Sequence, residues 1–247
     1  MLDVYQASDT NGANIQVYFD NGTDNQKWRI IQNANGTYRI MPAISSTRCA
    51  DVYGGGTNSG ADIKLWTYSG NTNQQWKMES ATILGVPQLG QEMSNWCWAA
   101  SARMVACQVA LTPPSQSSIV ASVKNSVIND GGDVSETLAA VKFASINNMI
   151  PYYWTNVLSL QDLISKISEG KPVIIFRDWM APDGSSTGRG HVTVIYGLHY
   201  ATTGTRFLIR DPEPENVGRT YVRTYAEIVD GRSTGVDTGV WAFSITR

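Results

Sequence analysis

The chain has 247 residues, of which 42% are hydrophobic and 16% are charged, an ordinary composition for a globular protein of one or two domains. Its formal net charge of −2, with acidic and basic residues mixed along the chain, gives no electrostatic footprint for nucleic acid or for a membrane surface. No apolar run approaches the roughly 20 residues of a membrane-spanning helix, and the first residues lack the pattern of a secretory signal. We therefore expect no nucleic-acid partner and no membrane insertion.

The first third of the chain contains an internal repeat with an offset of 48 positions. Residues 3–5 align with residues 51–53, and residues 25–28 align with residues 73–76. Within each copy, short stretches alternate polar and apolar residues between Gly- and Asn-rich turns, and helix signals are absent. A repeat of this length is one supersecondary unit used more than once, so we predict an all-β domain over residues 1–80.

These repeats resemble the ricin-type β-trefoil lectins, whose units end in a Gln-x-Trp signature, present here at residues 26–28 and 74–76. The resemblance implies glycan binding, in which carboxylates and amides bond to sugar hydroxyls while an aromatic ring packs on the sugar. Lys64 stands where the pattern has glutamine, which weakens the second site. The alternative is that the polar residues complete the hydrogen bonding of the repeat itself. The carbohydrate-binding candidates are Asp3, Gln16, Tyr18, Asn25 and Gln26 in the first copy and Asp51, Trp66, Asn73 and Gln74 in the second.

A trefoil is built from three units, whereas this stretch carries two, and the first lacks an opening strand. Two units cannot close a threefold barrel. We therefore expect a partial β-trefoil. Either a third unit is missing from this stretch, or the open edge is covered by the downstream domain or by a second chain, so that a dimer is one option.

The composition changes after Glu79, and residues 80–87 have the character of a connector into a second domain, which we assign to residues 81–247. Capping residues and apolar spacing predict helices first, and alternation predicts strands after Lys171-Pro172. This order favours an α+β domain with antiparallel strands. The predicted helices cover residues 97–110, 116–127, 134–144 and 160–168, and the predicted strands cover residues 173–176, 191–196, 206–210, 220–223 and 240–245.

Cys97 stands at the start of the first predicted helix, where unpaired N–H groups and the helix dipole favour a thiolate. The side-chain amide of Gln91, with the Cys97 N–H, could hold an oxygen that becomes negative during acyl transfer. The alternative is a core helix in which Cys97 is a small apolar filler. The flanking Trp96 and Trp98 are either packing residues or cleft walls. Three cysteines imply no disulfide framework. Cys107 would lie about 15 Å from Cys97 along the helix, too far for a disulfide between them.

A cysteine nucleophile requires a base, and the chain has two histidines that could supply it, His191 and His199. His191 begins an alternating strand that would direct it across a cleft, whereas His199 is interpreted as a solvated loop residue near a strand end. The following strand ends at Asp211, which an antiparallel neighbour would bring beside His191, where it could hold the imidazole in one orientation. Asp211-Pro212 is also a common strand end for conformational reasons alone.

Together, Gln91, the run from Cys97 to Ala100, His191 and Asp211 resemble the papain-like cysteine peptidases. Within that clan the sequence is closest to bacterial effector proteases of the staphopain-like and type III effector kind, and it is also similar to double-glycine leader peptidases. The resemblance spans about residues 84–247. It implies a Cys nucleophile, a His base, an Asp or Asn that orients the base, and a Gln in the oxyanion hole.

The sequence thus predicts a cysteine endopeptidase with an N-terminal carbohydrate-binding module, secreted as a toxin or effector and, as one option, delivered to a host cell. The expected partners are a protein or peptide substrate and glycans. No cofactor and no metal are predicted, although a divalent cation at the acidic pair Glu213 and Glu215 is left open. Two alternatives remain: an acyl transferase of deamidase or transglutaminase type on the same residues, and a lectin whose protease-like domain is inactive.

Overall fold

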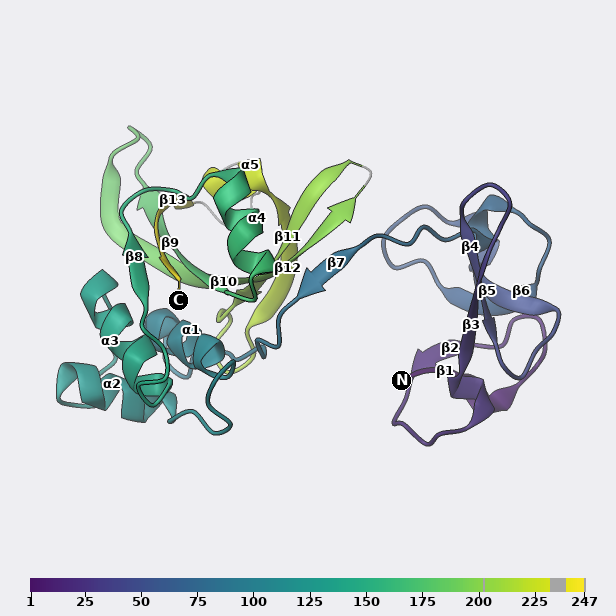
Figure 1. The fold of residues 1–247 in the computed structure, drawn as a ribbon, viewed down its shortest axis with the longest axis horizontal. Helices are drawn as coiled ribbons and strands as arrows, with labels where there is room; N and C mark the ends of the chain where they lie inside the picture. Colours follow the sequence, from purple (N-terminus) through teal and green to yellow (C-terminus); the bar gives the residue numbers. More distant parts are fainter. Residues whose placement is uncertain (202, 232–238, 247) are drawn as a thin grey trace. The chain divides into compact units, whose positions relative to one another are not determined.

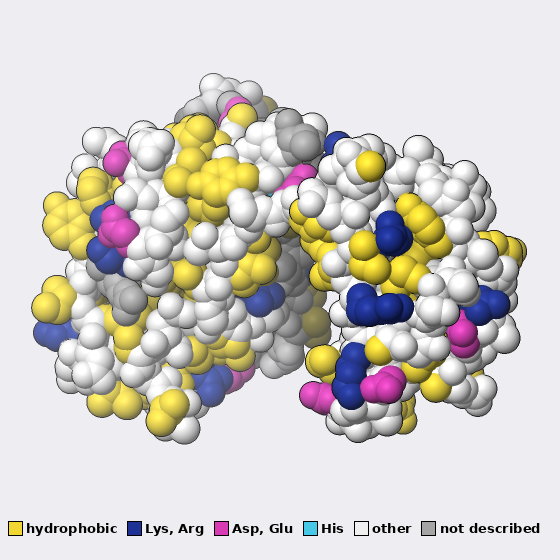
Figure 2. Space-filling model, turned by 45° about the vertical axis from the view of Figure 1, so that its right-hand side comes forward, with side chains coloured by type: hydrophobic (Ala, Val, Ile, Leu, Met, Phe, Trp, Pro, Cys, Tyr) yellow, Lys and Arg dark blue, Asp and Glu magenta, His cyan; other side chains and the backbone are white. Residues whose placement is uncertain are grey.

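The computed structural model describes residues 1–201, 203–231 and 239–246. The chain divides into two compact units, Met1–Met78 and Glu79–Arg247, which Figure 1 draws as a β-rich part and a larger mixed part. No helix among the described residues is long and apolar enough to span a membrane. On the face drawn in Figure 2, acidic and basic side chains both occur on each part, as the mixed charge pattern of the sequence predicts.

The first unit is built from antiparallel strand pairs, because its alternating segments are separated by turns rich in glycine and asparagine. No α-helix occurs in this unit, whose residues are all described, and short 3-10 turns follow the strands. This agrees with the predicted all-β domain. The pairs are β1 (Leu2–Val4) with β2 (Ile15–Val17), β3 (Trp28–Gln32) with β4 (Tyr38–Pro42), and β5 (Arg48–Val52) with β6 (Ile63–Thr67).

The second unit contains a seven-stranded sheet with helices packed on its two faces (Figure 1). The path of the sheet is β12-β11-β10-β9-β13-β8, with β7 also paired to β10, and the pairs are antiparallel. The strands are β7 (Ala81–Ile83), β8 (Tyr152–Trp154), β9 (Val173–Met180), β10 (Ser186–Ala201), β11 (Gly204–Asp211), β12 (Arg219–Thr224) and β13 (Gly239–Thr246). The helices are α1 (Cys97–Ala106), α2 (Gln116–Lys124), α3 (Val134–Ala144), α4 (Leu160–Ser168) and α5 (Tyr225–Val229).

Strand β9 shows how one sheet supports two cores. Its side chains alternate, so Ile174 and Phe176 join the core under α1, α2 and α3, whereas Val173 and Ile175 join the core under α4 and α5. Because both faces are covered, the strand is apolar over most of its length rather than alternating with polar residues. The α+β architecture predicted from the sequence is confirmed.

Several predicted bounds differ from the structure. Helix α1 ends at Ala106 rather than Ala110, and α2 ends at Lys124 because Asn125 adopts a left-handed conformation with φ of 59°. The interpretation of His199 as a loop residue is wrong, since β10 continues to Ala201 and the His199 Nδ1 lies 3.1 Å from a carboxylate oxygen of Glu79. Strands β7 and β8 and helix α5 were not predicted.

Candidate active site

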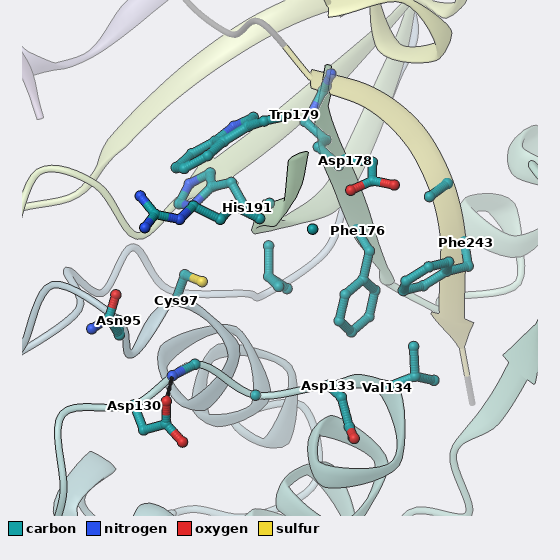
Figure 3. A pocket seen from close by; sticks show the side chains of 18 of the residues that line it. Asn95, Cys97, Asp130, Asp133, Val134, Phe176, Asp178, Trp179, His191 and Phe243 are labelled. Atoms are coloured by element: carbon teal, nitrogen blue, oxygen red, sulfur yellow. Dashed lines mark hydrogen bonds between the residues drawn. The ribbon is translucent and has the colours of Figure 1, made fainter. Parts of the chain in front are cut away.

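Cys97 is the first residue of α1 and lies partly exposed at one side of a cavity of about 730 Å³. His191, from the middle of the sheet, lines the same cavity, and Figure 3 shows the two residues on the same side of it. The cavity therefore brings together a thiol on a helix and an imidazole on a strand. All three cysteines are free in this structure.

Two buried tryptophans hold the start of α1 in place. The indole Nε1 of Trp96 donates to the carbonyl of Ile128 at 2.8 Å, and that of Trp98 donates to the carbonyl of Asp130 at 3.1 Å. Both side chains are essentially inaccessible to solvent and neither lines the cavity. Of the two predicted roles, packing is therefore the observed one, and the rings join α1 to the loop that forms the opposite wall.

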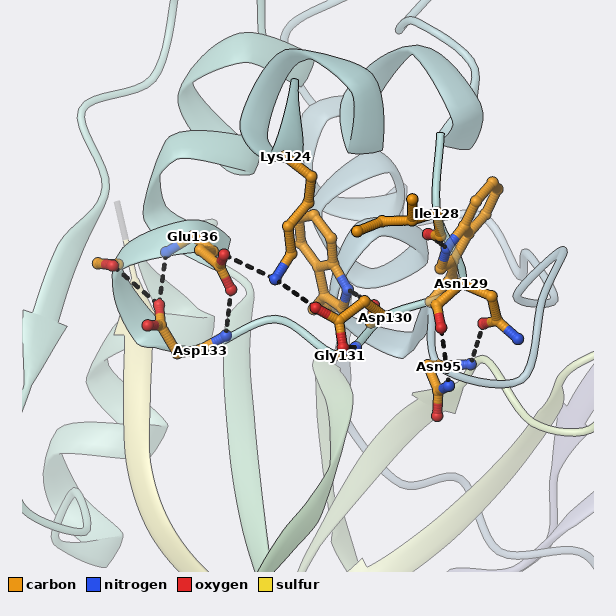
Figure 4. A network of polar contacts seen from close by, with 11 residues as sticks. Asn95, Lys124, Ile128, Asn129, Asp130, Gly131, Asp133 and Glu136 are labelled. Atoms are coloured by element: carbon orange, nitrogen blue, oxygen red, sulfur yellow. Dashed lines mark hydrogen bonds and ion pairs between the residues drawn. The ribbon is translucent and has the colours of Figure 1, made fainter. Parts of the chain in front are cut away.

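A polar network stiffens that loop (Figure 4). The ammonium of Lys124 lies 3.1 Å from the carboxylate of Asp130 and 2.7 Å from that of Glu136. Glu136 also forms a capping box with Asp133 at the start of α3, and the Asn95 N–H donates to the side chain of Asn129 at 3.0 Å. The wall is thus tied to α2, to α3 and to the segment before Cys97.

The strand register brings His191 to Asp211. Strands β10 and β11 pair antiparallel, and the His191 Nε2 lies 2.6 Å from the Asp211 Oδ1, with both side chains almost completely buried. The same carboxylate accepts the Glu213 N–H at 2.9 Å, and its Oδ2 accepts Arg219 Nε at 2.8 Å and faces Arg219 Nη2 at 2.7 Å. Asp211 is therefore held by three separate donor groups.

The electrostatics of this pair favour charged partners. Burial lowers the pKa of the His191 imidazole, but hydrogen bonds to the Asp211 and Cys97 side chains outweigh burial and raise the pKa from 6.5 to about 10. Burial raises the pKa of the Asp211 carboxyl, but its contacts with His191, the Glu213 N–H and Arg219 lower it on balance. At neutral pH the arrangement is an imidazolium between a carboxylate and the sulfur of Cys97.

Gln91 lies in the loop before α1 and is buried, with its backbone N–H bonded to the Pro212 carbonyl at 2.8 Å. Its side-chain Nε2 donates to the Ser94 carbonyl at 2.9 Å, which leaves a second N–H on the same nitrogen. Gln91 lines a smaller hollow that shares Ser94 and Glu213 with the main cavity. The structure thus places it beside the Cys97 cavity but not among the residues that line it.

Arg219 is the site residue that the sequence argument missed. It stands directly opposite Asp211 in the β11–β12 pair, so the register alone brings its guanidinium to that carboxylate. A basic residue at the start of the strand that follows a strand-ending aspartate was the available signal.

The polar sugar-binding candidates of the first unit lie together, but they bond mainly to one another. The Asp3 carboxylate accepts the amides of Gln16 at 3.0 Å, Asn25 at 2.7 Å and Gln26 at 3.1 Å. The fifth candidate, Tyr18, is 53% exposed. These contacts match the alternative in which the polar residues complete the repeat's own hydrogen bonding, while the half-exposed ring of Tyr18 lies with its centroid 5.9 Å from that of Phe19.

The second copy repeats part of this arrangement. Gln74 Nε2 donates to the buried Asp51 carboxylate at 2.8 Å, and Asn73 Nδ2 donates to the Val52 carbonyl at 3.1 Å. Trp66 is partly buried, with its ring centroid 5.7 Å from that of Tyr53. Gln26 and Gln74 therefore make the same bond to the aspartate of their copy, whereas the bonds of Gln16 and Asn25 to Asp3 have no counterpart in the second copy.

Among the described residues, no group of three or more His, Cys, Asp or Glu side chains is arranged to hold a metal ion. Of the acidic pair left open in the sequence, Glu213 is partly buried beside the cavity and Glu215 is exposed.

Comparison with protein families gives two matches. The model described as papain-like cysteine protease AvrRpt2 matches residues 77–229, and the model described as ricin-type beta-trefoil lectin domain-like matches residues 1–66 and 43–104. Both resemblances expected from the sequence are thereby confirmed. No curated protein matches the chain.

Three of the solved structures that are similar to the chain are the following. A designed threefold symmetric protein, ThreeFoil, is 37% identical over 34% of this chain and 57% of its own, with a TM-score of 0.30, so this chain spans little more than half of it. Procathepsin L 3 from the larval midgut of Tenebrio molitor is 11% identical, over 67% of this chain and 68% of its own, with a TM-score of 0.42. A Polyporus squamosus lectin, solved with a human-type influenza-binding epitope, is 18% identical, over 89% of this chain and 72% of its own, with a TM-score of 0.31.

Proposed function

The chain belongs to the AvrRpt2 family of papain-like cysteine proteases, and from this premise we propose that it is a cysteine endopeptidase whose lectin-like part binds glycans. One observation carries the peptidase proposal. The His191 imidazole is bonded to the buried Asp211 carboxylate, and Cys97, whose side chain helps to raise the pKa of His191, lines the same solvent-open cavity. A base fixed in this way and a sulfur beside it are what nucleophilic acyl transfer requires.

In the proposed mechanism the Cys97 thiolate attacks a peptide carbonyl carbon, and the carbonyl electrons move onto its oxygen. The Cys97 N–H and the remaining side-chain N–H of Gln91 stabilise that oxyanion. The His191 imidazolium gives its proton to the leaving amine, and a thioester forms. The neutral imidazole then takes a proton from water, the hydroxide attacks the thioester, and the carboxylic acid is released with the Cys97 thiolate, which restores the starting thiolate and imidazolium. Asp211 holds the ring orientation throughout.

The test is cleavage of a peptide mixture, followed by mass spectrometry of the products. We expect new peptide termini with wild-type protein and a loss of nearly all activity with Cys97→Ala. The matched control is Cys107→Ala, because Cys107 is a free, partly buried cysteine at the other end of the same helix and should be dispensable. Equal cleavage by wild type and Cys97→Ala would refute the proposal. Conversion of glutamine to glutamate in uncut peptides would instead support a deamidase.

For the N-terminal unit we propose glycan recognition that brings the peptidase to glycosylated proteins, as in a secreted effector. The support is the match to the ricin-type lectin domain and the exposed ring of Tyr18 beside the Asp3 network. Replacing Tyr18 with alanine in the full chain should abolish binding to the glycans that wild type selects on an array, while cleavage of a glycan-free peptide is unchanged. A wild-type protein that binds no glycan would argue against this role.

A further inference from the structure

The cavity extends beyond Cys97 and His191 into an apolar recess. The rings of Phe176 and Phe243 lie with their centroids 4.8 Å apart and, with Val134 at the start of α3, form an apolar part of its lining. Figure 3 shows both rings on the side of the cavity away from Cys97. A substrate held at the sulfur would therefore place a neighbouring side chain against an aromatic surface.

One carboxylate stands above these rings. Asp178 follows Phe176 by two positions in β9, so both side chains project from the same face of the strand. Its partner in β10 is Gly190, which has no side chain to cover the carboxylate, and Ala242 nearby is small. Figure 3 shows the Asp178 carboxylate on the same side of the cavity as the rings of Phe176 and Phe243.

Of the other three acidic side chains of this lining, Glu213 lies where the cavity meets the smaller hollow of Gln91 and Arg219, and the remaining two already have partners. Asp130 is paired with Lys124, and Asp133 accepts the Glu136 N–H as the cap of α3. Asp178 is partly buried, and within the described parts of the chain its carboxylate has neither a hydrogen bond nor an ion pair. A partly desolvated carboxylate beside an apolar surface gains from a cation that it can contact.

The basic residues that line the cavity do not supply this cation. Arg177 Nη1 donates to the carbonyl of Ile228 in α5, and Arg189 is an exposed residue of β10. The lining thus combines aromatic rings, which suit an aliphatic stem, with one carboxylate suited to its charged end.

We propose that this recess selects a lysine or arginine side chain of the substrate, with the stem on Phe176 and Phe243 and the cation against Asp178. The proposal rests on the peptidase function proposed above and names the class of substrate for that site. Asp178 is in this view a specificity residue and takes no part in bond breaking.

The experiment compares peptides that differ by one charge. Random peptide mixtures are prepared with lysine or its neutral isostere norleucine fixed at one position at a time, and kcat/KM is measured for wild type, Asp178→Asn and Asp130→Asn. At the position that enters the recess, wild type should prefer lysine by about tenfold or more. Asp178→Asn should reduce the ratio toward one and leave cleavage of the norleucine peptides nearly unchanged. Asp130→Asn removes the same charge from the same cavity, at a carboxylate already paired, and should keep the preference.

Binding of the same peptides to Cys97→Ala protein separates this proposal from the peptidase proposal. If no peptide is cut but Cys97→Ala binds lysine peptides more tightly than norleucine peptides, and loses this preference with Asp178→Asn, the recess is as proposed and the peptidase function fails. If peptides are cut with no preference for lysine at any position, or if Asp178→Asn keeps the wild-type preference, the proposed selectivity is wrong.

Discussion

Gly132 gives a direct test of whether packing of Trp98 fixes the wall opposite Cys97. A Cβ atom at residue 132 would lie 2.4 Å from Trp98 Cδ2 and 2.5 Å from Trp98 Cγ, whereas ordinary contacts begin at 3.4 Å. Relief of the shortest contact therefore needs a movement of about 1 Å, the difference between 3.4 and 2.4. Trp98 is completely buried and its Nε1 is bonded to the Asp130 carbonyl, so the ring and the loop must move together.

Overpacking of this kind costs about 1–3 kcal/mol. We expect Gly132→Ala to lower the free energy of unfolding of the second unit by about that amount, and to lower kcat/KM because the displaced loop carries the cavity wall. Urea denaturation followed by circular dichroism measures the first effect, and peptide cleavage measures the second.

The neighbouring Gly131 is a matched control, because a Cβ there would meet nothing within 4 Å and its φ is not in the left-handed region. Gly131→Ala should stay within about 0.5 kcal/mol of wild type. If both alanine variants had the same stability and the same activity, the packing of Trp98 against the loop would not fix the wall.

Three further predictions concern other buried polar groups. The contacts of Asp211 lower its pKa, so they stabilise the folded protein at pH values above the unfolded pKa of about 3.8, and this stabilisation is lost as the pH falls through the folded pKa. Arg219→Met should therefore lower the free energy of unfolding at neutral pH, and the difference from wild type should shrink in acid. Urea titrations at several pH values would measure this difference. Gln74→Ala leaves the buried Asp51 carboxylate without its donor at 2.8 Å and should cost the first unit about 1–3 kcal/mol in thermal or urea unfolding. Gln91→Ala should lower kcat about 10²-fold, with little change in KM, in steady-state peptide assays.

Each of these predictions has its own control. A constant difference between wild type and Arg219→Met from neutral to acidic pH would mean that the arginine does not act through Asp211, and Arg219→Lys should restore part of the neutral-pH stability. Gln32 is exposed in β3, so Gln32→Ala should leave the first unit unaffected. A large rise in KM with unchanged kcat for Gln91→Ala would contradict a role in oxyanion stabilisation.

The sequence predicted best those features that local chemistry determines. Helices α3 and α4 have the expected bounds because Asp133 and Ser159 cap them, each accepting a backbone N–H from the first turn. The approach of His191 to Asp211 was predictable as well, since two adjacent alternating segments separated by a short turn pair antiparallel. In both cases the determining residues lie within about 20 positions of each other.

Features that depend on distant partners were beyond the sequence. The role of Trp98 depends on the carbonyl of Asp130 across a loop, and β8 exists because Trp154 pairs with Ser244, ninety residues later in the sequence. The side chain of Gln91 illustrates the same limit: its spacing from Cys97 indicated an oxyanion donor, yet its bond to Ser94 is set by a loop that spacing does not describe.

The charge balance of the buried cluster connects the missed residue to the proposed chemistry. Asp211 carries one negative charge, while the imidazolium of His191 and the guanidinium of Arg219 carry two positive charges, so the three groups together carry a net charge of +1. The side chains of Asp211 and His191 are almost completely buried, whereas that of Arg219 is 38% exposed, so solvent screens part of its charge. Arg219 therefore balances the buried Asp211 carboxylate from the solvent side, so that this carboxylate is shared between two cations and only part of its charge is left to balance the His191 imidazolium in the cavity.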